Sequence, residues 1–301
     1  MKQRVVSLVP AATEIVCALG RGRQLAGRSH ACDFPPEIQA LPVCVTTRIS
    51  GQANVAAINA AVQAGGPIFQ IDLAALASVQ PDLILTQGQC GVCAIGQAEV
   101  ESAIAQLPGP RPQIVALSAA RVAGLWDDIA AVAAALGAQK EGRELLSILK
   151  NRVVDILQKT CAFKRRQTVA CLEWLDPLMG AGNWMPELVE FAGGNDVFGV
   201  AGQHSPWISG SELAAKNPEV IVLLPCGFDL PRARREAATL LAHADWRRLR
   251  AVKSGQVYLA DGNRYFNRPG PGLVDSLEIL AEILWPRLFS FSQHRQGWQK
   301  A

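Results

Sequence analysis

Two cysteines stand three positions apart in the run QCGVCA, residues 89–94. The spacing of Cys90 and Cys93 suits a bound metal ion or a redox-active thiol pair. A structural zinc site takes four ligands, and the sequence holds neither a second CxxC nor an HxxxH pair. His30 and Cys32 complete such a site only if their loop lies beside residues 89–94. Three interpretations therefore stay open: contact with a metal, thiol redox chemistry, and buried structural thiols.

The sequence lacks the common catalytic and nucleotide-binding motifs. Ser205 follows His204, but there is no GxSxG elbow to expose a nucleophile. The chain also has neither GxxxxGK[ST] nor GxGxxG, the loops that hold nucleotide phosphates. We therefore expect a non-catalytic protein that uses no nucleotide. A metal- or thiol-dependent enzyme built on Cys90 and Cys93 is the competing class.

The composition predicts a folded chain of about two domains. The 301 residues are 50% hydrophobic and 18% charged, which supports a large core and argues against disorder. At roughly 150 residues per domain, this length corresponds to two domains. The net charge is +3, and the basic residues are scattered without interleaved aromatic residues. Nucleic acid is therefore not expected as a partner.

The start of the sequence predicts a cytoplasmic protein. Met1 to Arg4 runs directly into an apolar strand closed by Pro10, which leaves no room for a secretory leader. We find no run of about 18 apolar residues that would insert into a membrane. Eight cysteines in a chain of this size do not resemble a disulfide framework. The periplasm is the alternative if a leader has been removed.

Strands followed by helices recur along the chain, which predicts an α/β fold with parallel sheets. In the first part, the strands are residues 5–9, 83–86 and 114–117, and the helices are 13–19, 97–107 and 122–136. Each strand is a continuous apolar run, as expected when helices cover both faces of a sheet. Gly137 is a plausible helix cap. The next helix, residues 138–160, carries one apolar stripe and is about 33 Å long.

The same alternation resumes after this helix, in residues 168–172, 186–191, 212–215, 220–224, 239–241, 257–260 and 273–284. We expect an N-terminal α/β lobe over residues 1–120 and a C-terminal α/β lobe over 166–286. Residues 121–165 would form a lobe helix and the connecting backbone helix, and 287–301 a polar, frayed tail. Two Rossmann-like lobes joined by one long helix would enclose a cleft, where we expect the function to lie.

Ligands of open parallel sheets bind beyond the carboxyl ends of the strands. In the first lobe this rule selects residues 10–13, 29–36, 46–51 and 87–94. In the second lobe it selects residues 173–184, 205–208, 225–229 and 262–272. Much of the chain's unusual chemistry falls in or beside these loops, including three of its seven tryptophans.

Several of these loops resemble the class III substrate-binding proteins, which capture cobalamin, ferric siderophores and haem for ABC importers. The resembling stretches are SLVPAATEIVCALG, ACDFPPE, LASVQPDLILTQ, PLMGAGNWMPELVEFAGGNDVFG, NPEVIVLLPCGFD and YFNRPGPGLVDSLEILAEIL, which together extend from about residue 4 to 286. QCGVCA, PCGFD and YFNRPGP most resemble a leaderless branch described as cobalamin-binding. The resemblance implies two lobes, one backbone helix, little hinge motion and no catalysis.

The implied ligand is cobalamin or a related corrinoid, held in the cleft. A ferric siderophore or haem, bound for an ABC importer, is the alternative. Aromatic side chains bury the apolar face of such a ring, and arginines pair with a phosphate or propionate on its rim. His30 is the candidate axial ligand of the metal, and His204 is a second candidate. The candidate ligand-binding residues are Pro10, Ala11, Thr13, His30, Cys32, Arg48, Gln87, Gln89, Cys90, Trp174, Trp184, Trp207, Phe228, Tyr265, Phe266 and Arg268.

Relatives that dock on a transporter carry one exposed glutamate near the start of a helix in each lobe. The matching positions here are Ala74 and Ser211, with Glu212 one place beyond the second. Loss of both acids argues against ordinary import by an ABC transporter. We therefore expect a cytoplasmic ligand carrier or sensor rather than a docking component.

Overall fold

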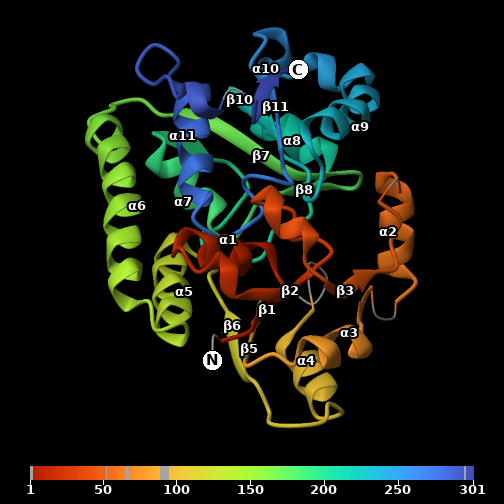
Figure 1. Ribbon diagram of the computed structural model, residues 1–301. Helices are drawn as coiled ribbons and strands as arrows, with labels where there is room; N and C mark the ends of the chain where they lie inside the picture. The colour runs from red at the N-terminus through yellow and green to blue at the C-terminus, as the bar shows by residue number, and fades with distance from the viewer. Residues whose placement is uncertain (1–2, 52, 66–67, 89–94, 295) are drawn as a thin grey trace. The chain divides into compact units, whose positions relative to one another are not determined.

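The computed structural model describes residues 3–301 except 52, 66–67, 89–94 and 295, and it divides into two compact units (Figure 1). Unit 1 comprises Met1–Ala119 and Ala123–Ile148. Unit 2 comprises Ala120–Val122 and Leu149–Ala301. Each unit is built around its own sheet, which confirms the predicted α/β class.

Unit 1 contains a six-stranded sheet in the order β4-β3-β2-β1-β5-β6. All neighbouring strands are parallel except β3 and β4, which are antiparallel. Its strands are β1 (Val5–Ser7), β2 (Leu25–Ser29), β3 (Val43–Thr47), β4 (Phe69–Ile71), β5 (Leu83–Gln87) and β6 (Gln113–Leu117). Its helices are α1 (Pro10–Ala18), α2 (Val55–Gln63), α3 (Leu73–Val79), α4 (Gln97–Ile104) and α5 (Val122–Ala135), with 3-10 turns η1 (Gly22–Gln24) and η2 (Pro36–Ala40).

The central strands of unit 1 are apolar because both of their faces are covered. Val6, Leu8 and Ile84 belong to one buried cluster with side chains of α3 and α4. Pro10 occupies the first position of α1, where the missing backbone N–H costs no helical hydrogen bond. The chain therefore turns from β1 into α1 within two residues.

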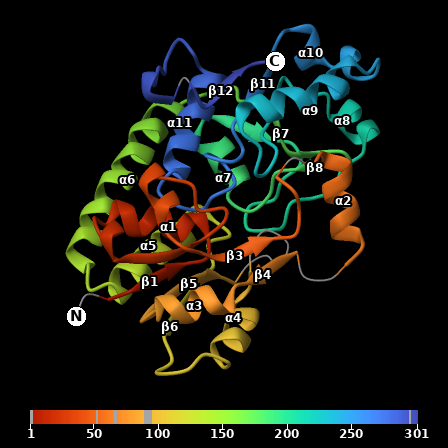
Figure 2. The same ribbon diagram turned by 45° about the vertical axis from the view of Figure 1, so that its right-hand side comes forward.

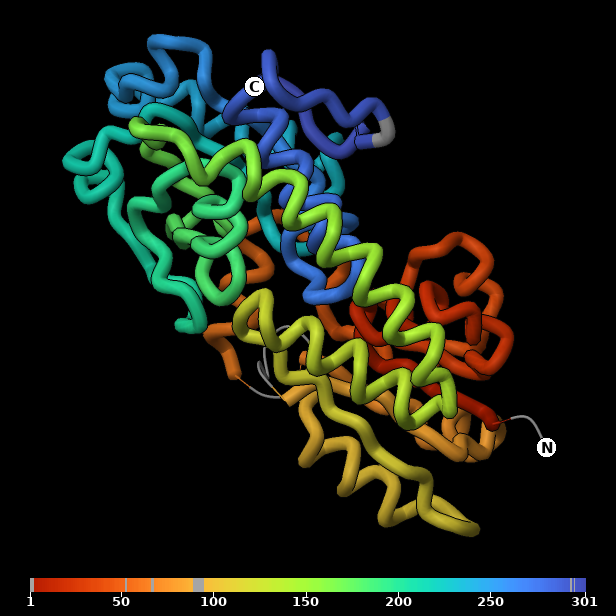
Figure 3. Tube along the Cα trace, turned by 90° about the vertical axis from the view of Figure 1, so that its left-hand side faces the viewer, coloured from red at the N-terminus to blue at the C-terminus, as the bar shows by residue number. Residues whose placement is uncertain are grey.

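Helix α6 (Gln139–Thr160) begins in unit 1 and continues into unit 2 without interruption (Figure 3). Gly137 lies between α5 and α6 with φ +62°, the left-handed conformation that ends a helix, as predicted. A Cβ atom on Gly142 would lie 2.7 Å from Cβ of Ala133, so glycine allows α5 and α6 to approach closely. With 22 residues, α6 is about 33 Å long, as the sequence indicates.

Unit 2 contains a second sheet in the order β12-β11-β10-β7-β8, and β9 also pairs with β7. Strands β7, β10 and β11 are mutually parallel, while β8 and β12 are antiparallel to their neighbours. Its strands are β7 (Gln167–Leu175), β8 (Leu178–Gly180), β9 (Gly194–Asp196), β10 (Val220–Leu223), β11 (Val257–Ala260) and β12 (Trp298–Lys300). Its helices are α7 (Met185–Phe191), α8 (Gly210–Lys216), α9 (Leu230–Ala242), α10 (Arg250–Lys253) and α11 (Leu273–Leu284), with 3-10 turns η3 (Trp246–Arg248) and η4 (Ser292–His294).

The prediction of a frayed tail after residue 286 is wrong. Strand β12 pairs antiparallel with β11 (Figure 2). The ring of Trp298 meets that of Tyr258 edge-on, with 5.6 Å between the ring centroids. His294 is 6% exposed and its Nε2 lies 2.7 Å from Oε2 of Glu278. The polar composition of the tail concealed these anchors, which pair with residues that lie far away in the sequence.

Among the described residues, every helix is too short or too polar to cross a lipid bilayer.

Candidate functional site

The predicted ligand loops of unit 1 follow strands that are parallel neighbours. Strands β1, β2, β3 and β5 are consecutive in the sheet and run in the same direction. Their carboxyl ends therefore lie at one edge of the sheet. Pro10 follows β1, His30 follows β2, Arg48 follows β3 and Gln87 ends β5. The sheet thus brings these four predicted residues to a common edge.

His30 is held in a defined orientation by its neighbours. Its Nδ1 lies 3.2 Å from the carbonyl oxygen of Val45 and 3.3 Å from Oγ of Ser29. Because a carbonyl oxygen accepts but does not donate, Nδ1 carries the proton, and Nε2 of the neutral ring is the acceptor. Burial lowers the pKa of His30, which favours this neutral form. A neutral imidazole oriented through its other nitrogen is the usual form of a histidine metal ligand.

Other predicted residues of this edge are buried beneath it. Oγ1 of Thr13 bonds to Oγ of Ser7 at 2.8 Å, and Sγ of Cys32 donates to the carbonyl oxygen of Ser7 at 3.7 Å. Thr13 and Cys32 are fully buried, and Ala11 is 4% exposed. The side chains of Thr13 and Cys32 therefore anchor helix α1 and the loop after β2 to strand β1.

Arg48 is exposed, and Gln87 is half-buried. Gln89, Cys90 and Cys93 lie outside the described residues, so all three interpretations of the CxxC motif remain predictions. Cys32 would need to leave its contact with Ser7 to join a metal site with them.

The predicted loops of unit 2 also share one sheet edge, because β7, β10 and β11 are parallel neighbours. Trp174 lies in the carboxyl half of β7, and its ring centroid is 5.5 Å from that of Phe228, in the loop after β10. The guanidinium carbon of Arg232 lies 3.7 Å from the Phe228 centroid. Phe228 is 1% exposed, so Trp174 and Arg232 are the accessible members of this stack. We call Trp174, Phe228 and Arg232 the aromatic–arginine stack.

Sequence reasoning missed Arg232. Its position could have identified it, because Arg232 lies in the first turn of the helix that follows the predicted ligand loop 225–229. Burial lowers the pKa of Arg232, and the nearby acids Glu236 and Asp229 oppose that effect. Stacking on an aromatic face orients the planar guanidinium, whose donors match carboxylate and phosphate groups.

Trp184, Phe266 and Arg268 lie inside the loops rather than on their surface. Nε1 of Trp184 donates to the carbonyl oxygen of Phe266 at 2.7 Å. Arg268 is 7% exposed and donates to Oδ1 of Asn263 at 2.9 Å. Phe266 is completely buried with φ +65°, an uncommon conformation for a bulky residue. These contacts brace the loop after β11, and Tyr265, half-buried, packs against Phe266 edge-on at 6.5 Å.

Trp207 is the most accessible of the predicted aromatic residues, with 59% of its surface exposed. It forms an isolated antiparallel bridge with Met179 of β8. A tryptophan held by its backbone with its ring in solvent is a suitable contact for an apolar ligand face.

His204 and Ser205 each have a polar contact with a backbone group. Nδ1 of His204 lies 3.2 Å from the carbonyl oxygen of Ser205, and Oγ of Ser205 accepts from the backbone N–H of Gly182 at 3.0 Å. The serine hydroxyl therefore supports the loop after β8, and the His204 ring remains exposed beside it.

A second group of metal-ligating types occurs elsewhere in unit 2. Ligand atoms of Asp275, Glu278 and His294 lie within 4.8 Å of one another. A terminal nitrogen of Arg152 already lies 2.6 Å from Oδ1 of Asp275 and 2.8 Å from Oε2 of Glu278. The guanidinium supplies the positive charge that these acids need. We therefore describe this group as an ion-pair cluster that fixes α6 and η4 to α11.

The two positions matched to docking glutamates differ from each other. Ala74 is exposed in the first turn of α3. Ser211, the second matched position, is exposed in the first turn of α8, with its Oγ 2.9 Å from Oγ of Ser209. Glu212, one place beyond it, forms a capping box with Ser209, accepting the Ser209 backbone N–H at 2.7 Å. These hydrogen bonds hold the pKa of Glu212 below its ordinary value. Its carboxylate is exposed, but it already stabilises the helix start.

A two-sheet α/β chain with its unusual side chains on the strand-end loops is characteristic of a ligand-binding protein. A family model described as Periplasmic binding protein matches residues 5–263. The chain belongs to this family, which confirms the resemblance found in the sequence.

Among similar proteins is the uncharacterized ABC transporter substrate-binding lipoprotein YvrC of Bacillus subtilis (strain 168). It is 22% identical over 295 residues, which cover 95% of this chain and 81% of that protein. Two solved structures are also similar. The periplasmic vitamin B12 binding protein BtuF of Vibrio cholerae superposes with a TM-score of 0.69 at 21% identity, covering 95% of this chain and 98% of that one. The periplasmic heme-binding protein RhuT of Roseiflexus sp. RS-1 superposes with a TM-score of 0.70 at 19% sequence identity, covering 95% of this chain and 99% of that one. At these identities the two structures share the fold with this chain.

Proposed function

We propose that this protein binds a metal chelate with a broad ring, specifically cobalamin or a related corrinoid, without catalysing a reaction. The observation that carries the proposal is the aromatic–arginine stack at the ligand edge of the unit 2 sheet. An aromatic ring covers the apolar face of a corrin, and an oriented guanidinium pairs with its phosphate. The exposed Trp207 adds a second aromatic surface to the same set of loops.

The strand-end loops of unit 1 offer further groups suited to such a ligand. His30 offers Nε2 of a neutral imidazole as an axial ligand for cobalt, and Arg48 offers a cation for the polar rim. The names of the solved relatives support a tetrapyrrole-like ligand, since one is a vitamin B12 binding protein and another a heme-binding protein.

Haem is the second candidate, because its propionates would also pair with Arg232. The YvrC name supports a role as the substrate-binding component of an ABC transporter. Ala74, which has no carboxylate, supports instead a carrier or sensor in the cytoplasm that does not dock in the usual way. Immunoblots of cell fractions from the source organism test the compartment.

Titration of the purified protein with cobalamin, cobinamide, haemin and a ferric siderophore tests the ligand. We expect tryptophan fluorescence to be quenched by the corrinoids, with a shift in their visible absorbance. Trp207→Ala should weaken that binding about tenfold or more, as for an aromatic contact at the centre of an interface. Ile148→Ala, at another exposed apolar residue, is the matched control. Binding of none of the four probes would refute the ligand assignment.

A further inference from the structure

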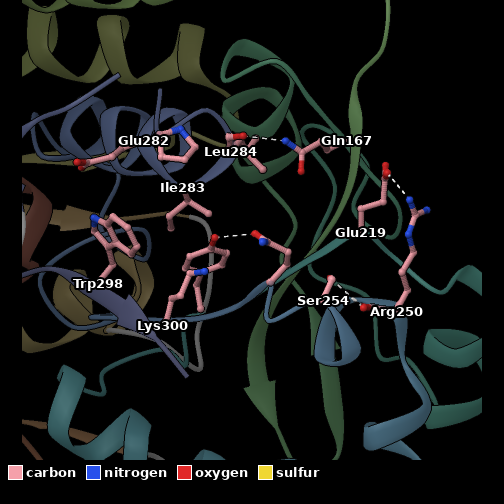
Figure 4. A pocket seen from close by; sticks show the side chains of 12 residues that line it. Gln167, Glu219, Arg250, Ser254, Glu282, Ile283, Leu284, Trp298 and Lys300 are labelled. Carbon is pink, nitrogen blue, oxygen red and sulfur yellow. Dashed lines mark hydrogen bonds and ion pairs between the residues drawn. The ribbon is translucent and has the colours of Figure 1, made fainter. Parts of the chain in front are cut away.

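The amino ends of the unit 2 strands border an open cavity of about 640 Å³, and several of its polar lining groups are paired within the protein (Figure 4). Oε1 of Glu219 accepts from both Arg165 and Arg250, at 2.6 and 2.8 Å. Nε2 of Gln167 donates to the carbonyl oxygen of Leu284 at 2.7 Å. Contacts of this kind hold the elements of unit 2 together and do not indicate a ligand.

Arg28 of unit 1 differs from these cations, because its guanidinium group contacts only main-chain oxygens. It is half-buried on β2 and takes part in none of the ion pairs among the described residues. Its Nη1 lies 3.1, 3.5 and 3.3 Å from the carbonyl oxygens of Ser29, His30 and Cys32. Its Nη2 donates to the carbonyl oxygen of Gln39 at 3.0 Å. One side chain therefore contacts four carbonyl groups between residues 29 and 39.

These carbonyl groups belong to the end of β2 and to the loop that follows it, one of the predicted ligand loops. Because a guanidinium group is planar and its donors point in fixed directions, the four acceptors must keep one mutual arrangement to reach it. The ammonium group of a lysine is a compact charge without this fork. Arg28 thus determines the backbone path of the loop that carries His30 and Cys32.

His30 is fixed on both sides of its Cα atom. Its backbone N–H donates to the carbonyl oxygen of Val45 at 2.9 Å, and Nδ1 of its ring lies 3.2 Å from the same oxygen. Its own carbonyl oxygen faces Nη1 of Arg28. Strand β3 therefore holds one peptide group of His30 and Arg28 the other. Since these two groups set the direction of the bond from Cα to Cβ, they also direct the ring.

We propose that Arg28 is the positioning residue of the His30 loop, holding the His30 backbone so that Nε2 of the ring is offered to the metal of a bound chelate. Arg28 acts through His30 and does not contact the metal. The step that involves the metal rests on the proposed function. The orientation of the ring does not, because it can be measured in the protein without a ligand.

NMR spectroscopy of the free protein tests the orientation of the ring. In the wild type, the ¹⁵N shifts of His30 should show one neutral form with the proton on Nδ1. Arg28→Met keeps a long side chain without donors, so the loop carbonyl groups lose their common partner and the ring should give averaged shifts. Arg28→Lys should give an intermediate result. Arg23→Met, at an exposed arginine of η1, is the matched control and should leave the His30 shifts unchanged.

Two forms of cobinamide test the metal step in the full chain. Diaquocobinamide can exchange an axial water for a histidine nitrogen, whereas both axial positions of dicyanocobinamide are occupied by cyanide. Arg28→Met should weaken binding of diaquocobinamide about tenfold or more and leave binding of dicyanocobinamide within about twofold. In a His30→Ala background, Arg28→Met should cause no further loss, because Arg28 acts only through His30. Visible absorbance measures both ligands.

Unchanged ¹⁵N shifts of His30 in Arg28→Met overturn the proposal, whichever ligand the protein binds. Equal weakening of the two cobinamides also overturns it, since the loss would then come from a general change in the loop. If Arg28→Met does not fold, Arg28→Lys takes its place, and wild-type shifts and binding in that variant overturn the proposal. Failure of both cobinamides to bind the wild type counts against the proposed function, and the NMR measurement then decides the role of Arg28 by itself.

Discussion

The indole nitrogen of Trp184 donates a 2.7 Å hydrogen bond to the main-chain carbonyl oxygen of Phe266. This bond joins the loop after β8 to the loop after β11, and both residues are buried. Since Phe266 has a left-handed backbone conformation, the bond also helps to hold an unfavourable φ angle in place. Trp184 therefore positions the ligand loops of unit 2 from within.

Trp184→Phe should keep most of the packing but leave the Phe266 carbonyl unpaired. We expect the free energy of unfolding to fall by about 1–3 kcal/mol, the cost of a buried polar group without its partner. Urea unfolding followed by circular dichroism measures the change. Trp207→Phe, at an exposed tryptophan, should change stability by less than about 0.5 kcal/mol. Equal losses in the two variants would contradict a bracing role.

Arg232→Gln should test whether Arg232 binds the phosphate group on the rim of the proposed ligand. The guanidinium is stacked on Phe228 at 3.7 Å, and under the proposed function it would pair with the phosphodiester of cobalamin. Cobinamide lacks that group, so the substitution should weaken cobalamin binding about tenfold or more and leave cobinamide binding nearly unchanged. Fluorescence titration of both ligands measures the two effects.

Arg234→Gln provides the matched control, because Arg234 lies two residues further along α9 and is exposed. Equal weakening for both corrinoids in Arg232→Gln would show that Arg232 supports the loop rather than the phosphate.

Asp196 should make the protein less stable as the pH rises toward neutrality. Burial raises the pKa of Asp196 from 3.8 to about 6, although its Oδ1 accepts the backbone N–H groups of Phe198 and Gly199. The Asp196 carboxyl group therefore stays protonated to a higher pH in the native state than in the unfolded state. Its contribution to stability is complete below about pH 3.8 and is lost as the pH rises through about 6, on the order of 3 kcal/mol.

Asp196→Asn keeps an acceptor for both N–H groups and cannot ionise. Between about pH 4 and 7, the wild type should lose more unfolding free energy than this variant, by that same amount. Urea unfolding at a series of pH values measures the difference. Parallel pH profiles would show that the carboxyl group ionises in the native state at its ordinary pKa.

Glu278 should contribute stability with the opposite dependence on pH. Burial alone raises its pKa, but hydrogen bonds from His294 and Arg152 outweigh burial and hold the pKa below 4.5. Its stabilising effect is therefore present above pH 4.5 and is lost as the pH falls through the lower native value. Arg264 and Asp275 face the same cluster.

Glu278→Gln should lower the free energy of unfolding by about 2–4 kcal/mol at neutral pH, since Arg152 and His294 lose a buried partner. The difference in unfolding free energy between the wild type and Glu278→Gln should become smaller as the pH falls below 4.5. Glu144→Gln, at an exposed pair with Lys140, should have almost no effect. A deficit that is constant from neutral to acidic pH would contradict an ionised Glu278.

The predicted helices and strands agree best with the structure where local patterns were strong. β11 and α11 have the predicted bounds, and α6 begins one residue later than expected. The short antiparallel strands β4, β8 and β12 were missed, because three residues carry too little periodicity to identify a strand. Helix α9 was recognised only over residues 239–241, since its first half is rich in arginine and lacks an apolar stripe.

The candidate site was predicted as a set of loops, and the parallel strand order of each sheet places those loops on common edges. Which side chains are accessible could not be predicted. Cys32, Trp184, Phe266 and Arg268 have the types expected of ligand contacts but are buried with partners inside the protein. Arg232 was overlooked because its role depends on Phe228, with which it shares no recognisable motif.

The sequence by itself determined the α/β class, the long helix α6 and the loops that follow the parallel strands. These features follow from apolar periodicity and from glycine and proline positions, which act over a few residues. Tertiary structure alone decided the pairing of β12 with β11 and the buried hydrogen bond between Trp184 and Phe266. Burial and pairing depend on residues brought together from distant parts of the chain, and local sequence carries no record of those partners.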